Sequence, residues 1–255
     1  MSITLTELKT SLDNQLQPWL WNDYGPNGLQ IEGQKNISKI AFSVSATKES
    51  IKKSADWGAQ ALIVHHGLFW KFHGPKTITG AFAQRVKPLI KNEINLLGYH
   101  LPLDAHLDFG NAAQIAKLLG MTDIKSFGDH KGSPTGVKGN IQKVKSKKLK
   151  EKLEQILSHQ VLHANPETDP DISTIGIITG GANSDWQLAH KERLDAYITG
   201  EMSEHDWHES QESGIHMFAG GHNATEQFGI QALKEYIQKQ FPNIETTFFS
   251  SENPA

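Results

Sequence analysis

Apolar residues along this chain fall into two patterns, short continuous runs and longer stretches with helical spacing. The run at residues 61–64 contains only apolar residues, which is typical of a strand buried on both faces. Comparable segments predict further strands at residues 39–44, 94–100, 173–179, 195–199, 215–219 and 246–249. The strand pattern therefore recurs from one end of the sequence to the other.

Helical patterns separate these strands. Thr4 and Glu7 have the spacing of a capping box, and leucines follow them at helical intervals. Further helices are predicted at about residues 47–57, 80–92, 111–119 and 203–212, and after Asn223, which can cap the last long helix. Strands that alternate with helices indicate an α/β fold with mixed, mostly parallel sheets covered by helices.

A change in composition between residues 125 and 140, where glycines gather around Pro134, predicts a boundary between two lobes. We expect two intimately joined α/β lobes. Residues 1–128 with 200–255 would form a metal-binding lobe, and residues 129–199 the second lobe. The expected site lies at strand carboxyl ends between them, because ligands of open α/β sheets bind there.

Composition narrows the classes of function. The 255 residues include 37% hydrophobic and 21% charged residues, as in a soluble globular protein, and the formal net charge is −3. Lysines concentrate only at residues 143–152, which we interpret as a solvated strand edge and helix start. The charge therefore disfavours duplex nucleic acid as the main ligand.

The chain contains no cysteine, which excludes disulfides, thiolate zinc sites, iron–sulfur clusters and cysteine nucleophiles. No basic segment followed by an apolar core marks a signal peptide, and no apolar run is long enough to span a membrane. We expect a cytoplasmic protein without a membrane partner.

Histidines and carboxylates follow three of the predicted strands. His65 and His66 end the run at residues 61–64, and neutral imidazole is a good metal ligand. Asp104 follows the strand at residues 94–100. His222 and Glu226 follow the strand at residues 215–219 and are four residues apart, so a helix would place them on one face.

Alternatives remain open for several of these segments. Asn223 and Glu226 also have capping-box spacing, which would make Glu226 a helix-start residue. The turn-rich segment at residues 22–31 is either a plain connection, which we prefer, or a loop packed over a site. Gly180 and Gly181 are better explained by a tight turn between strand and helix than by an anion cradle.

Convergence at three strand ends favours metal binding. Three histidines and two carboxylates suit zinc, manganese, iron, cobalt or nickel, and the identity of the metal cannot be read from them. The set is too large for one tetrahedral ion with an open position. It suits two divalent ions that share a bridging carboxylate.

Five motifs in this order resemble the Nif-three-like family, also known as GTP cyclohydrolase I type 2 homologues or dinuclear metal-centre proteins. They span nearly the whole chain, at residues 25–30, 64–67, 100–106, 199–201 and 219–226. The resemblance implies that two metal ions are held by His65, His66, Asp104, His222 and Glu226, with Glu226 as the bridge. It also implies the shorter bacterial form and a homo-oligomer, usually a hexamer.

The leading hypothesis for function is a metal-dependent hydrolase that acts on a nucleotide or a related heterocycle. Candidates for orienting the ligands or for proton transfer are Glu201, His205, His100 and His106. The alternative is a non-enzymatic, metal-loaded scaffold, a metal-delivery protein or a regulatory interaction protein.

Overall fold

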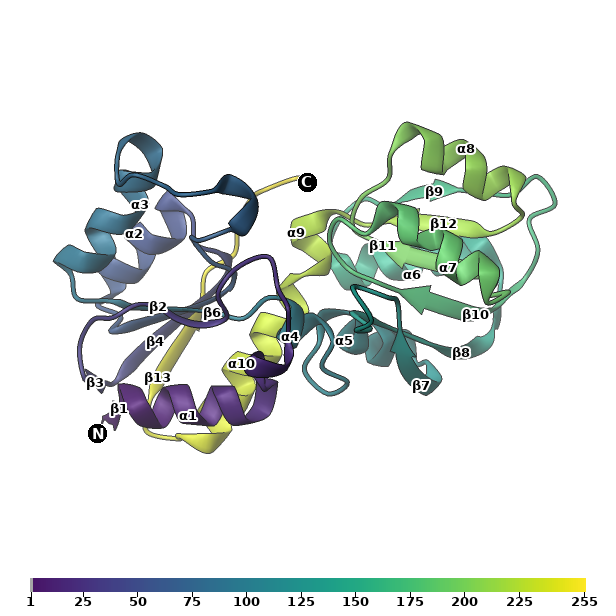
Figure 1. The fold of residues 1–255 in the computed structure, drawn as a ribbon. Helices are drawn as coiled ribbons and strands as arrows, with labels where there is room; N and C mark the ends of the chain where they lie inside the picture. Colours follow the sequence, from purple (N-terminus) through teal and green to yellow (C-terminus); the bar gives the residue numbers. More distant parts are fainter. Residues whose placement is uncertain (1) are drawn as a thin grey trace. The chain divides into compact units, whose positions relative to one another are not determined.

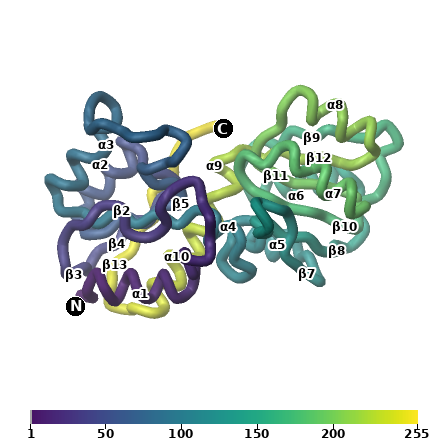
Figure 2. The backbone as a smooth tube through the Cα atoms, viewed as in Figure 1, coloured from purple at the N-terminus to yellow at the C-terminus, as the bar shows by residue number. Residues whose placement is uncertain are grey.

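The computed structural model describes residues 2–255 and divides the chain into two compact units. Unit 1 contains the residues up to Leu103 and Ile230–Glu252, and unit 2 contains Asp104–Gly229 and Asn253–Ala255. Each unit is a β-sheet with helices on both faces, and the second is inserted into the sequence of the first (Figures 1 and 2).

Unit 1 is built on a five-stranded sheet in the order β13-β4-β5-β6-β2. Its strands are β2 (Gly28–Ile31), β4 (Lys39–Ser45), β5 (Ala61–His66), β6 (Asn95–Gly98) and β13 (Glu245–Phe248). All neighbouring pairs are parallel except β2 with β6. A separate two-stranded antiparallel sheet pairs β1 (Ile3–Thr4) with β3 (Asn36–Ile37).

Helices cover both faces of the unit 1 sheet, with α2 and α3 on one face and α1 and α10 on the other (Figures 1 and 2). They are α1 (Leu5–Leu16), α2 (Lys48–Trp57), α3 (Gly80–Lys91) and α10 (Gln227–Gln240), with 3₁₀ turns η1 (Pro18–Leu20) and η2 (Lys71–His73). The central strand β5 is buried along its whole length apart from His66, as its continuous apolar run predicts.

Unit 2 contains a six-stranded mixed sheet in the order β7-β8-β10-β11-β12-β9. Its strands are β7 (Thr122–Phe127), β8 (Gly136–Val144), β9 (Leu162–Ala164), β10 (Ile172–Ile177), β11 (Ala196–Thr199) and β12 (His216–Ala219). The three central strands β10, β11 and β12 are parallel, and the outer pairings are antiparallel.

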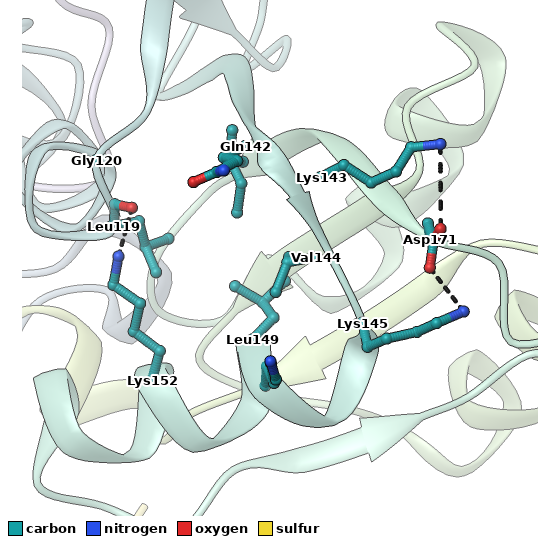
Figure 3. A pocket seen from close by; sticks show the side chains of 11 residues that line it. Leu119, Gly120, Gln142, Lys143, Val144, Lys145, Leu149, Lys152 and Asp171 are labelled. Carbon is teal, nitrogen blue, oxygen red and sulfur yellow. Dashed lines mark hydrogen bonds and ion pairs between the residues drawn. The ribbon is translucent and has the colours of Figure 1, made fainter.

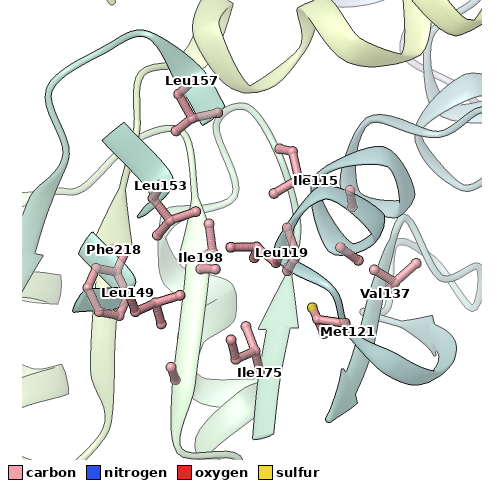
Figure 4. Close-up of a cluster of buried hydrophobic side chains, with 14 of the residues drawn as sticks. Ile115, Leu119, Met121, Val137, Leu149, Leu153, Leu157, Ile175, Ile198 and Phe218 are labelled. Atoms are coloured by element: carbon pink, nitrogen blue, oxygen red, sulfur yellow. The ribbon is translucent and has the colours of Figure 1, made fainter. Parts of the chain in front are cut away.

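The helices of unit 2 pack on opposite faces of its sheet. They are α5 (Asn111–Leu119), α6 (Ser146–Leu157), α7 (Trp186–Lys191) and α8 (Glu204–Glu212), with the short α9 (His222–Thr225) and the 3₁₀ turn η3 (Asn183–Asp185). The short helix α4 (Leu101–Asp104) begins in unit 1 and ends with the first residue of unit 2. Figure 4 shows α5 and α6 side chains, including Leu119 and Leu153, packed against Ile198 and Phe218 of the sheet. Tyr197, the neighbour of Ile198, belongs to the other cluster with Trp186, since successive strand residues face opposite sides.

The structure confirms the α/β class and several predicted helix ends. Thr4 and Glu7 form the predicted capping box, with the Glu7 amide donating to Thr4 Oγ1 at 3.1 Å. Gly120 ends α5 in the left-handed conformation, with φ 76°, which glycine adopts without strain. Asn223 does not cap the last helix, because α9 and α10 are separate helices.

The two units do not have the expected limits. A boundary between residues 128 and 129 would separate β7 from its antiparallel partner β8. A boundary between residues 199 and 200 would separate the parallel strands β11 and β12. Pairing between strands that are distant in sequence therefore overrides the local change in composition. Among residues 2–255, no helix has both the length and the apolar character needed to cross a membrane.

Candidate metal centre

Three histidines gather at the carboxyl edge of the parallel strands in unit 1. Ser45 of β4 is opposite His66 of β5, and Val64 of β5 is opposite Gly98 of β6. His100 follows β6 by two residues and so reaches the same edge. The rings of His65, His66 and His100 each offer a nitrogen that lies within 4.8 Å of the others, close enough to hold a metal ion.

The Nδ1 atom of each of these histidines has a partner within unit 1. His65 Nδ1 donates to the Tyr99 carbonyl oxygen at 3.0 Å, and His66 Nδ1 lies 3.0 Å from Ser45 Oγ. His100 Nδ1 donates to Asp23 Oδ1 at 2.8 Å. A neutral imidazole that carries its proton on Nδ1 has its lone pair on Nε2, which is the usual state of a metal-binding histidine.

Asp23 fixes the position of His100. Its side chain is buried, and its two oxygens accept from the His100 ring, the Asn27 amide at 2.8 Å and the Leu101 backbone N–H at 2.9 Å. Burial alone would raise the pKa of this carboxyl. The hydrogen bond and the Coulombic attraction from His100, with the bonds from Asn27 and Leu101, outweigh burial and lower the pKa from 3.8 to about 2.

The segment at residues 22–31 leads into a short strand, β2, as the preferred interpretation expects, but its turn residues also contact neighbouring loops. Asn27 Oδ1 accepts the His100 backbone N–H at 2.8 Å. Gln30 Oε1 accepts the Leu68 N–H at 2.9 Å, just beyond His66. A Cβ atom on Gly67 would lie 2.2 Å from Gln30 Nε2, so only glycine leaves room for this contact. The segment therefore holds the loops that follow both β5 and β6.

Unit 2 presents acidic and imidazole groups at the carboxyl edge of its own parallel strands. Thr179 follows β10, Glu201 follows β11 and His222 follows β12. Asp104, on α4, is buried, and its Oδ1 accepts from Asn111 Nδ2 at 2.9 Å and from Thr179 Oγ1 at 3.4 Å. These bonds hold the carboxylate in place before any ion binds.

His222 lies between two carboxylates. Its Nδ1 donates to Glu201 Oε1 at 2.6 Å, and its Nε2 lies 3.1 Å from Glu226 Oε2. Burial opposes the charged form of His222, but hydrogen bonds and Coulombic attraction from Glu226 and Glu201 prevail and raise the pKa of His222 to about 9. The two carboxylates therefore attract a cation to this position, whether a proton or a metal ion.

The capping-box alternative for Glu226 does not hold. Helix α9 starts at His222, its N-cap is Gly221, and no side chain caps it. Glu226 follows the last residue of α9 and is buried with its carboxylate toward His222. A Cβ atom on Gly180 would lie 2.1 Å from Glu226 Oε1. The turn after β10 therefore needs glycine at this position, with φ 70°, to leave room for the Glu226 carboxylate.

The structure distinguishes among the four predicted catalytic candidates. Glu201 contacts His222, and His100 belongs to the histidine cluster of unit 1. His106 instead accepts the Asp108 and Phe109 backbone N–H groups through Nδ1, which is a loop-forming contact. His205 is an exposed residue of α8, 3.5 Å from Asp206 Oδ1, and no described contact joins it to Glu201, His222 or Glu226.

Sequence reasoning missed the residues that hold the candidate ligands, namely Asp23, Ser45, Asn111 and Thr179. Asp23 is 77 positions from His100 in the sequence, and Thr179 is 75 positions from Asp104. No periodic pattern links such pairs. The sequence offered one signal for Asp23, namely the alternative interpretation of residues 22–31 as a loop packed over a site.

Comparisons with known proteins agree with the motif resemblance. A family model described as Duf34/NIF3 (NGG1p interacting factor 3) matches residues 3–254. A Pasteurella multocida protein named "GTP cyclohydrolase 1 type 2 homolog" is 40% identical over 251 residues, which cover 98% of each chain.

Two solved structures resemble the whole chain. One, described as "protein ybgI, unknown function", has a TM-score of 0.90 and 38% identity, and the match covers 99% of this chain and 100% of that one. The other, TTHA1606 from Thermus thermophilus, has a TM-score of 0.90 and 29% identity with the same coverage.

Replacing Asp23 by Asn is expected to lower the free energy of unfolding by about 2 kcal/mol at pH 7, the equivalent of a pKa shift from 3.8 to about 2. Because the folded pKa is depressed, this stabilisation is present above pH 3.8 and is lost as the pH falls through about 2. Urea unfolding of the wild-type and Asp23→Asn proteins should show a difference in the free energy of unfolding that becomes smaller below about pH 4. Asp56→Asn, which removes an exposed ion pair with Lys52, is the control and should have a much smaller effect.

Proposed function

This chain belongs to the Duf34/NIF3 family, and from that premise we propose that it is a two-metal hydrolase acting on a nucleotide or a related heterocycle. The proposed ligands are His65 and His66, which end β5, Asp104 on α4, and His222 and Glu226, which follow β12. The proposed metals are divalent zinc, iron, manganese, cobalt or nickel.

The observation that carries the proposal is how the histidines are held. His65, His66 and His222 each have Nδ1 engaged by an oxygen, from Tyr99, Ser45 and Glu201 respectively. With Nδ1 engaged, Nε2 is the nitrogen through which each ring would coordinate a metal, and at His222 the metal would replace the proton that Nε2 shares with Glu226. The buried carboxylate of Asp104 is likewise fixed by hydrogen bonds.

Five ligands exceed the needs of one tetrahedral ion and fit two ions bridged by Glu226. Two bound ions would supply a water molecule of lowered pKa and polarise the atom under attack. Within the chain, Glu201 holds the His222 ring, and its exposed carboxylate is a place where a proton can be taken up or released.

His100 is the second candidate for proton transfer. The bond to Asp23 orients its ring, and the edge of Trp70 packs against that ring with centroids 5.1 Å apart at 89°. An imidazole backed by a buried carboxylate can hold a proton at Nε2 and return it. The aromatic wall restricts water on this side of the ring.

Elemental analysis of protein purified without a chelator should find about two transition-metal ions per chain, as expected for a two-metal centre. Glu226→Gln should reduce the occupancy of both ions, because the bridging carboxylate serves both. Glu212→Gln, an exposed residue of α8, is the matched control and should leave metal content unchanged. If the Glu226 variant retains both metals, the bridging assignment is wrong.

Metal-replete protein should hydrolyse GTP or another member of a panel of nucleotides and phosphoesters, and a chelator should abolish the turnover. Glu201→Gln should lower turnover about 10- to 100-fold while metal content changes less, since orienting groups tune their ligands. Asp104→Ala protein gives the background rate. Activity of the wild-type protein no higher than this background would favour the metal-loaded scaffold or metal-delivery protein instead.

We also propose that the protein is a homo-oligomer, in line with the hexamer implied by the motif resemblance. Exposed aromatic residues in unit 1 support this, since Trp19 and Phe72 are 64% and 68% exposed and such residues are enriched at interfaces. Light scattering should give a particle of about 170 kDa, six times the 28.3 kDa of one chain. A monomer throughout the micromolar range would contradict the proposal.

A further inference from the structure

A cavity of about 760 Å³ in unit 2 is lined by lysines and lies outside every residue of the proposed metal centre. Lys143 comes from the end of β8, Lys145 precedes α6, and Lys148 and Lys152 lie on α6. Among the described residues that line the cavity, Asp171 is the only acidic one. The volume is within the range of small-molecule sites, about 300–1,000 Å³.

The lysines occupy both sides of this cavity. Figure 3 shows Lys143 and Lys145 extended toward Asp171, with Nζ atoms 4.0 and 2.7 Å from its carboxylate. On the other side Lys152 Nζ donates to the Leu119 carbonyl oxygen at 2.6 Å. A ligand that meets cations on both sides must itself carry more than one negative group.

The cavity holds an excess of positive charge although the net charge of the chain is −3. The lining contains four lysines and one carboxylate, of which Lys143 and Lys145 lie beside that carboxylate, and no described residue of 2–255 forms an ion pair with Lys148. Lys148 and Lys152 are four residues apart on α6, a spacing at which like charges destabilise a helix.

The start of α6 adds to this excess. Its first turn contains no acidic residue, and its N-cap, Lys145, makes no side-chain capping bond. The positive end of the helix dipole therefore lies beside lysines, the reverse of the favourable arrangement. An anion bound in the cavity would relieve both the repulsion among the lysines and the repulsion from the helix end.

We propose that this cavity binds a chain of phosphate groups, supplied either by inorganic polyphosphate or by the tail of a nucleoside triphosphate. The lining residues within 2–255 include no aromatic side chain, so they offer no platform for stacking a base. Ile141, Val144 and Leu149 in the lining are apolar and offer no hydrogen bonds to a base, which leaves the Gln142 amide as a neutral polar group beside the lysines. Recognition therefore depends on the phosphates.

The test compares two pairs of lysine substitutions by calorimetric titration with sodium tripolyphosphate. Lys148→Gln with Lys152→Gln removes two cavity cations, and affinity should fall at least about tenfold, the equivalent of one or two lost charged hydrogen bonds. Lys87→Gln with Lys91→Gln removes an exposed pair of the same spacing on α3 and should leave affinity unchanged. Bound tripolyphosphate should also raise the Tm of the wild-type protein more than that of the cavity variant.

Titrations in the Asp104→Ala background separate this site from the metal centre, because tripolyphosphate also chelates metals. Persistence of the lysine effect in that background supports the proposal whether or not the protein is a hydrolase. If ATP binds as tightly as tripolyphosphate, the cavity recognises the phosphate chain that both ligands share. If ATP binds more weakly, inorganic polyphosphate is the preferred ligand. Absence of saturable tripolyphosphate binding, equal losses in both lysine pairs, or binding of ATP alone would overturn the proposal.

Discussion

Parallel pairing of short, buried strands is the constraint on which both units depend. In unit 1 the register sets Ser45 opposite His66 and Val64 opposite Gly98, so strands of unequal length end at one edge. In unit 2 the register of β10, β11 and β12 does the same. The interior of each sheet is mostly apolar, because burying an unpaired polar group there is costly, and the buried Ser43 of β4 is hydrogen-bonded to the Phe249 carbonyl oxygen. The histidines and carboxylates of the candidate site instead follow the carboxyl ends of the strands.

Hydrogen bonds at Nδ1 orient the rings of these histidines, which are the candidate metal ligands and their neighbour His100. A buried imidazole must satisfy both ring nitrogens, and a bond from Nδ1 to an oxygen decides which nitrogen keeps the lone pair. A backbone carbonyl accepts from His65 and carboxylates accept from His100 and His222, whereas the Ser45 hydroxyl beside His66 can either donate or accept. The carboxylates also bring negative charge to an edge where cations are expected to bind.

Burial decides how strongly the charges of this protein act. Asp23 is 3% exposed, and its bonds shift its pKa despite the cost of desolvation. The lysines around the α6 cavity are exposed, so each contributes weakly, and only their number and convergence favour the binding of an anion. The same chain thus presents a cation-attracting set of carboxylates and a separate anion-attracting cavity within unit 2.

The sequence by itself determined the elements and the candidate ligands. Apolar runs gave the strands, and helical spacing and caps gave most of the helices. The candidate ligands stood out because they come after such runs: His65, His66, Asp104, His222 and Glu226. These features depend on neighbours in the chain. Only the tertiary structure decided the limits of the two units, the role of Asp23, and the meeting of Asp104 with Asn111 and Thr179. Those outcomes depend on strand pairings and hydrogen bonds between distant segments, and such contacts leave no periodic trace in one sequence.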